Sequence, residues 1–280
     1  MRRESFETPG EVTLDIRLPE GSVELETAAG STTTEVELDA RGNDDEVREL
    51  LEDARIELRE VRGGHEVIVH VGDRRRVGFG FWRKVDVRLS IRAREGANVR
   101  AEVASADIRG RGRFGSVEAK AASGDVEFDQ VAAEAKASAA SGDVSLQSVG
   151  GAATVNTASG DVELGRIDGE LSVKTASGDV AVEEAGSRVK VQTASGDQRI
   201  AAVTAGTVEL QSASGDIKVG IRLGSNVWVD ARAMSGDLSS ELELGDEAPG
   251  DDAPLVELRA TSMSGDVKVV RAPAATNLNR

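Results

Sequence analysis

Aliphatic and polar residues alternate in short runs along most of the chain, and from residue 99 onward these runs recur at fixed positions. A Ser-Gly-Asp tripeptide, generally followed by an aliphatic residue, marks each repeat, at Ser123, Ser141, Ser159, Ser177 and Ser195, in steps of about 18 residues. In the copy that begins at Ser159, the aliphatic positions are Val162, Leu164, Ile167, Leu171 and Val173. Alternation at period two predicts strands with one buried face, and the fixed repeat predicts identical strands stacked on one another.

Each repeat is therefore expected to form one coil of a single-stranded parallel β-helix, an all-β solenoid with about 18 residues per coil. A left-handed helix of three hexapeptides has the same coil length, but it would place aliphatic residues at every sixth position, which this pattern does not do. We therefore favour the right-handed form, in agreement with the general handedness of parallel crossovers. A degenerate copy stands at Ser105. Later copies at Ser214, Ser235 and Ser264 follow longer steps, which we interpret as loop insertions that leave the repeat intact.

The first hundred residues show the same alternation with interruptions. Strands are expected within 6–40, and the stretch 20–25 resembles a worn copy of the repeat, so the solenoid is expected to begin there. One short amphipathic helix is predicted near residues 44–54, with Asn43 as its N-cap. We interpret it as a cap over the apolar first coil, and a partner-binding helix is the alternative. Further strands are expected at 55–61, 65–71 and 85–91.

These patterns divide the chain into three parts. Residues 1–98 are predicted to form degenerate β coils with the helix, and 99–270 the regular solenoid. Residues 271–280 lack periodicity and are expected to form a flexible tail. The acidic, Pro-containing stretch 245–254 is expected to be a loop that leaves the penultimate coil.

Charge is unevenly distributed along the chain. The net charge of −16 disfavours general nucleic-acid binding. Between Arg74 and Arg113, however, about 12 basic residues stand against about 4 acidic ones. The absence of Cys excludes disulfides and thiolate chemistry. No apolar segment has the length of a signal-peptide core or a membrane span, which leads us to expect a cytoplasmic protein.

A basic, aromatic stretch within this region is the candidate binding site. Its residues are Arg74, Arg75, Arg76, Phe79, Phe81, Trp82, Arg83 and Lys84. One interpretation is a loop that binds an anionic surface, which could be lipid, nucleic acid or an acidic protein. The other is a long hairpin whose aromatic residues fold back over the solenoid end while its arginines pair with the acidic body.

The tripeptide itself also allows two interpretations. Glycine adopts the positive φ of a tight corner, and Ser and Asp bond to backbone groups that the bend leaves unpaired. The alternative is a calcium ladder formed by Asp125, Asp143, Asp161, Asp179 and Asp197. With one Asp per coil the ladder offers few oxygen ligands, and we favour the corner role.

No pattern of a catalytic site emerges. Neither His65 nor His70 has a neighbour at catalytic or metal-ligand spacing, and nucleotide-binding glycine motifs are absent. We therefore expect no enzyme activity, no cofactor and no small-molecule substrate. A carbohydrate-active β-helix enzyme stays an alternative, because solenoids host such enzymes.

The recurring phrases Thr157–Val162 and Thr175–Val180 resemble a bacterial β-strand-repeat family of unknown function (domain of unknown function 4097), often labelled "putative adhesin". The resemblance covers most of the chain and implies a parallel β-helix, and the adhesin label presumes export. We accordingly expect a non-enzymatic scaffold or adhesin-like interaction module that binds a protein partner or self-associates through its solenoid ends. The alternative is a binder of anionic surfaces through residues 74–84.

Overall fold

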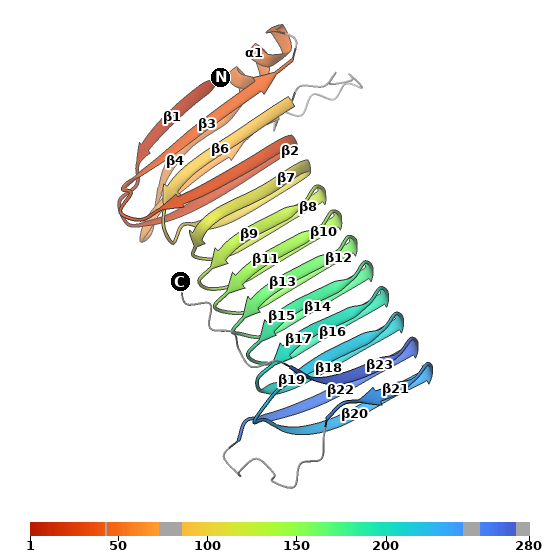
Figure 1. The fold of residues 1–280 in the computed structure, drawn as a ribbon. Coiled ribbons are helices and arrows are strands. Elements are labelled where there is room, and N and C mark those ends of the chain that lie inside the picture. The colour runs from red at the N-terminus through yellow and green to blue at the C-terminus, as the bar shows by residue number, and fades with distance from the viewer. Residues whose placement is uncertain (43, 73–85, 243–252, 273–280) are drawn as a thin grey trace. The chain divides into compact units, whose positions relative to one another are not determined.

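The computed structural model of this chain describes residues 1–42, 44–72, 86–242 and 253–272. They form an all-β, solenoid-like arrangement of mainly parallel strands with one short helix, which confirms the predicted fold class. Contacts divide the chain into two compact units, Met1–Gly142 and Asp143–Arg280. Each unit is described by itself, with the element labels of Figure 1.

The first unit contains ten strands and the helix. They are β1 (Arg2–Glu7), β2 (Glu11–Ala28), β3 (Thr33–Arg41), α1 (Asp44–Asp53), β4 (Arg55–Val61), β5 (Gly64–His70), β6 (Asp86–Arg94), β7 (Asn98–Phe114), β8 (Val117–Ser123), β9 (Val126–Val131) and β10 (Ala135–Ser141). Beyond residue 97 every pairing within this unit is parallel, whereas β1–β3, β3–β6 and β4–β5 are antiparallel.

The pairing of strand β2 supports the interpretation of residues 20–25 as a worn copy of the repeat. It pairs in parallel with β7 along nearly its whole length, and Glu20 and Gly21 lie opposite Ser105 and Ala106. On its other side β2 pairs with β5 through its first half and with β6 through its second half. One strand therefore supplies both faces of a coil, because it bends at the glycine where later copies have their corner.

The antiparallel strands and the helix close the outer side of this unit. Helix α1 joins β3 to β4, and Leu50 and Ala54 at its C-terminal end are buried. The Arg2 guanidinium donates hydrogen bonds to the carbonyls of Leu51 (3.1 Å) and Ala54 (2.7 Å). A cation at carbonyls that lack intrahelical partners favours the helix end. These contacts support the capping interpretation of α1. The proposed N-cap, Asn43, lies outside the described residues.

The second unit contains the remaining strands. They are β11 (Val144–Val149), β12 (Ala153–Ser159), β13 (Val162–Ile167), β14 (Leu171–Ser177), β15 (Val180–Ala185), β16 (Val189–Ser195), β17 (Gln198–Val203), β18 (Gly206–Ser214), β19 (Ile217–Arg222), β20 (Asn226–Ser235), β21 (Leu238–Ser240), β22 (Leu255–Ser264) and β23 (Val267–Ala272). Two strands make each coil, and successive coils pair in parallel with like residues opposite, as in Val162↔Val180 and Ser159↔Ser177.

The predicted columns face the core. The aliphatic residues of the copy at Ser159 are at most 2% exposed. A further inward column carries hydroxyl groups, at Thr157, Thr175, Thr193, Ser212 and Ser262, and it too is buried. Gln198 replaces an aliphatic residue beside this column and donates hydrogen bonds to the Thr193 hydroxyl and the Gln211 carbonyl, each at 2.8 Å. The interior of this unit therefore has a polar seam within an aliphatic core.

The last coils do not stack in chain order. Strands β22 and β23 lie directly on β18 and β19, while β20 and β21, which come earlier in the chain, pair with the outer side of β22 and β23. The coil with the fuller apolar column thus takes the inner place: Val267 and Val269 lie opposite Leu238 and Ser240. The expected loop 245–254 lies largely outside the described residues. Strand β23 includes Arg271 and Ala272, so the predicted tail starts two residues too early.

Candidate functional site

The Ser-Gly-Asp corners form a regular hydrogen-bond ladder in the second unit. The backbone N–H of Asp179 donates a hydrogen bond to Oδ1 of Asp161 at 2.8 Å. The backbone N–H of Asp197 donates one to Oδ1 of Asp179, also at 2.8 Å. The corner glycines have φ between 129° and 143°. At Gly178 an added Cβ would lie 2.1 Å from the carbonyl oxygen of Gly160, so the stacking requires glycine. These contacts support the corner role of the tripeptide.

The calcium ladder proposed for the same aspartates is not tested by this geometry. A carboxylate oxygen in each corner accepts a hydrogen bond from a backbone N–H of the following coil, at Asp143, Asp161, Asp179 and Asp197. In the part of the chain that the structure describes, no group of three or more His, Asp or Glu residues is placed to hold a metal ion.

The predicted basic aromatic site lies outside the described residues. Arg74, Arg75, Arg76, Phe79, Phe81, Trp82, Arg83 and Lys84 all fall within residues 73–85. Its role in binding stays a prediction.

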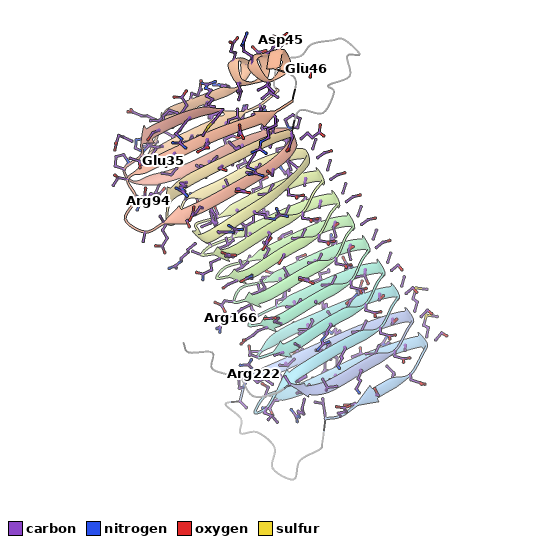
Figure 2. The ribbon with its side chains drawn as sticks, turned by 45° about the horizontal axis from the view of Figure 1, so that its top comes forward. Glu35, Asp45, Glu46, Arg94, Arg166 and Arg222 are labelled. Atoms are coloured by element: carbon purple, nitrogen blue, oxygen red, sulfur yellow. The ribbon has the colours of Figure 1, made fainter. Side chains whose placement is uncertain are left out.

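The described part of the basic region is paired with acidic residues across strands. Arg92 Nε lies 3.0 Å from Glu26 Oε2, and Arg109 Nε lies 3.6 Å from Glu127 Oε2. Figure 2 labels Glu35 and Arg94 on the neighbouring strands β3 and β6. Opposite charges on adjacent strands stabilise a sheet face by small amounts. Much of the positive charge between residues 86 and 113 thus belongs to the sheet surface.

The cavities among the described residues are shallow. One of 440 Å³ lies at turns of the first unit and is lined by residues that include Ser31, Arg94, Glu95 and Arg113. Another of 260 Å³ lies over β18, β22 and β20, and Asp230, Arg232 and Arg259 line it. Charged side chains that already have ion-pair or hydrogen-bond partners line both.

The outermost described coil of the second unit exposes residues that are buried in every other coil. Val229 of β20 lies opposite Leu258, and Leu238 of β21 lies opposite Val267. Leu258 and Val267 are 0% and 1% exposed, whereas Val229 is 40% and Leu238 is 53% exposed. The outer face of β20 adds Trp228, with the Arg259 guanidinium 5.6 Å from its ring centroid, and Met234, which is 78% exposed.

Strand β20 also has a backbone edge on which no described strand pairs. The Asn226 amide donates to the Pro254 carbonyl at 2.8 Å, next to the start of β22. Because alternate residues of a strand point their backbone groups to the same side, the even-numbered residues of β20 face β22. The N–H and C=O groups of Val227, Val229, Ala231 and Ala233 therefore face away from β22. An edge of this kind is a template for pairing with a further strand.

The sequence analysis expected contact through the solenoid ends, but it did not identify β20 and β21 as the outermost described coil of the second unit. Two signals were present: Trp228 and Met234 fall at outward positions, and Ser240 stands where other copies have an aliphatic residue. Neither signal shows that the coil is outermost, because that depends on the exchanged order of β20 and β22.

The chain belongs to the Toastrack DUF4097 family, whose sequence model matches residues 12–270. This confirms the family resemblance found in the repeat phrases. No established activity comes with the family. In the described residues no helix has the length and apolar character needed to cross a membrane. No curated protein matches the chain.

Several solved structures are similar to the chain at low identity. A "putative adhesin" from Bacteroides fragilis NCTC 9343 is 13% identical with a TM-score of 0.45, over 96% of each chain. A "putative lipid binding protein" from Parabacteroides distasonis ATCC 8503 is 14% identical with a TM-score of 0.47, also over 96% of each chain. A "putative cell adhesion protein" from Clostridium sporogenes ATCC 15579 is 10% identical with a TM-score of 0.24, over 96% of this chain and 99% of that one.

Proposed function

We propose that this chain is a non-enzymatic interaction module that binds protein through the terminal coil, defined as β20 and β21. The observation that carries the proposal is the exposure of Val229 and Leu238, which occupy core columns and would be covered by one more coil. An apolar cross-section beside an unpaired strand edge favours strand addition, in which main-chain hydrogen bonds supply affinity and side chains supply specificity.

The repeat supports the non-enzymatic part of the proposal. Its many serines and aspartates are corner residues, and the Asp carboxylates are engaged by backbone amides of the next coil. These carboxylates stabilise the corners of the coils through backbone hydrogen bonds and are not arranged as the nucleophile and base of a catalytic site. The function is therefore sought at the end of the stack, where the repeat stops.

Association of the purified full chain tests this function. Sedimentation velocity across a concentration series is expected to show a rise in mass for the wild type. Val229→Lys and Leu238→Lys each place a charge in the contact and are expected to move that rise to at least roughly tenfold higher concentration. Ala181→Lys, at an exposed position of β15, is the matched control and should leave it unchanged. A wild type that stays monomeric throughout, or end variants that associate normally, would contradict the proposal.

The basic composition of residues 74–84 supports a second candidate function, the binding of an anionic surface. It predicts that the full chain cosediments with vesicles that contain phosphatidylserine and that the Arg74, Arg75 and Arg76 to Ala triple variant does not. A duplex DNA pulldown with the same pair separates nucleic acid from lipid. Binding that is absent, or equal in both proteins, removes this candidate.

A further inference from the structure

Self-pairing of β20 is restricted to a few registers by its backbone geometry. In an antiparallel pair, residues directly opposite either both face the partner backbone or both face away from it. Val227, Val229, Ala231 and Ala233 face the edge of β20 that no described strand occupies. A symmetric pair of two copies must therefore be centred on a single residue, so that each edge-facing residue meets another.

The charges of β20 disfavour two of these registers and favour a third. A pair centred on Asp230 places this carboxylate opposite its own copy, and a pair centred on Arg232 does the same for the guanidinium. Like charges directly opposite are unfavourable. A pair centred on Ala231 instead places Asp230 of each copy opposite Arg232 of the other. Asp230 and Arg232 already form a bidentate ion pair within one chain, at 3.1 and 3.2 Å. The second copy would convert two such pairs into a four-charge network.

The same register matches the apolar residues. It places Trp228 opposite Met234 on the outer face, and sulfur–aromatic contacts of this type are favourable. On the inner face Val229 meets Ala233, and Ala231 meets its own copy. This register gives a partner to the exposed large side chains of β20, Trp228, Val229 and Met234.

We propose that the terminal coil binds a second copy of this chain, through an antiparallel β20–β20 pair with its twofold axis at Ala231. The proposal rests on the function proposed above and names the partner of that site. A twofold pair uses the same edge in both copies and so closes at the dimer. It leaves no free β20 edge for further addition.

Cross-linking tests the register, because the chain has no Cys and a single introduced thiol is unique. In Ala231→Cys the two thiols lie opposite each other, with Cα atoms about 5.5 Å apart, within the range of a disulfide. Mild oxidation is expected to give a covalent dimer on a non-reducing gel. Ala233→Cys is the matched control: the two copies of residue 233 lie about 14 Å apart along the strands, beyond disulfide range. A mixture of Ala233→Cys and Val229→Cys chains is expected to form the hybrid dimer.

Charge exchange provides an independent test. Asp230→Arg and Arg232→Asp each place like charges opposite one another and are expected to raise the dimer Kd at least roughly tenfold. The double variant restores opposite charges and is expected to recover the wild-type Kd. Arg199→Asp, at an exposed position of β17, is the control and should have no effect.

The outcomes separate this proposal from the function on which it rests. A mass that saturates at the dimer, with the Ala231→Cys cross-link, supports it. Mass that grows beyond the dimer, or equal cross-linking of Ala231→Cys and Ala233→Cys, overturns the twofold pair. If Leu238→Lys still moves that association to at least roughly tenfold higher concentration, the interaction function stands. A monomeric wild type overturns both.

Discussion

The outer strands of the first unit and the terminal coil of the second unit differ in whether their inward-facing apolar side chains are covered. In the first unit, antiparallel strands and α1 cover the apolar side, and Leu38 and Val36 of β3 are fully buried. In the second unit, the inward residues Val229 and Leu238 of the outermost described coil are exposed. An apolar cross-section that no described residue of the chain covers is available to a partner. The difference supports the proposal that the terminal coil is a contact surface.

Truncation of core leucines should separate a covered coil from the terminal coil most strongly. Leu258→Ala is expected to lower the free energy of unfolding by about 2–5 kcal/mol, because it leaves a cavity in a filled core. Leu238→Ala should cost less than about 1 kcal/mol, because its side chain is 53% exposed. Urea denaturation of dilute, monomeric protein measures both. Equal losses would show that the terminal coil is covered in solution.

Removal of the Arg2 guanidinium tests how the first unit is closed. Arg2→Ala is expected to cost about 1–2 kcal/mol, because two carbonyls at the end of α1 lose a charged donor. Faster hydrogen exchange in α1 should accompany the loss. Arg3→Ala removes only an exposed ion pair with Glu37 and should cost clearly less than Arg2→Ala. If the two variants exchange at the same rate in α1, Arg2 does not hold the helix.

The corner ladder predicts a smaller effect inside the second unit. Asp179→Ala leaves the Asp197 amide without its carboxylate acceptor and is expected to cost about 1 kcal/mol. Asp179→Asn keeps an acceptor oxygen and should cost about half as much or less. Thermal unfolding without added metal measures both. If calcium stabilises the wild type but not Asp179→Asn, the corner interpretation is wrong and the calcium ladder gains support.

The smallest predicted effect is a pH dependence beside the terminal coil. The hydrogen bond from Lys268 Nζ, at 2.6 Å, lowers the pKa of the Glu241 carboxyl. A lowered folded-state pKa means that the contribution to stability is present above the ordinary carboxyl pKa and disappears as the pH falls through the lowered value. Wild type and Glu241→Gln should therefore differ slightly at about pH 7 and coincide at about pH 2. A difference that persists in acid would contradict this assignment.

The repeat could be interpreted from sequence alone because its signal is local. A two-residue alternation interrupted by Ser-Gly-Asp every coil leaves only one face of each strand to be buried, and Val162, Leu164 and Ile167 are buried as predicted. The worn copy at Glu20–Leu25 was found in the same way. The helix α1 could be predicted because its apolar residues follow a 3.6-residue period and its first turn is acidic.

The terminal coil could not be identified in this way because stacking order is a non-local property. The copies at Ser235 and Ser264 carry the same tripeptide, and either could lie against β18. The structure places the later copy there, since Val256, Leu258, Val267 and Val269 complete the core columns, whereas Ser240 does not. The neighbours of each coil, more than its own sequence, decide how much of it is exposed.

The sequence by itself determined the coil, its corners, its inward columns and its family, because each depends on residues a fixed distance apart along the chain. Only the tertiary structure decided which coil is outermost, and with it which valine and leucine of equivalent columns are exposed. The physical reason is that burial depends on what pairs with both edges of a coil, and those partners can come from distant parts of the chain.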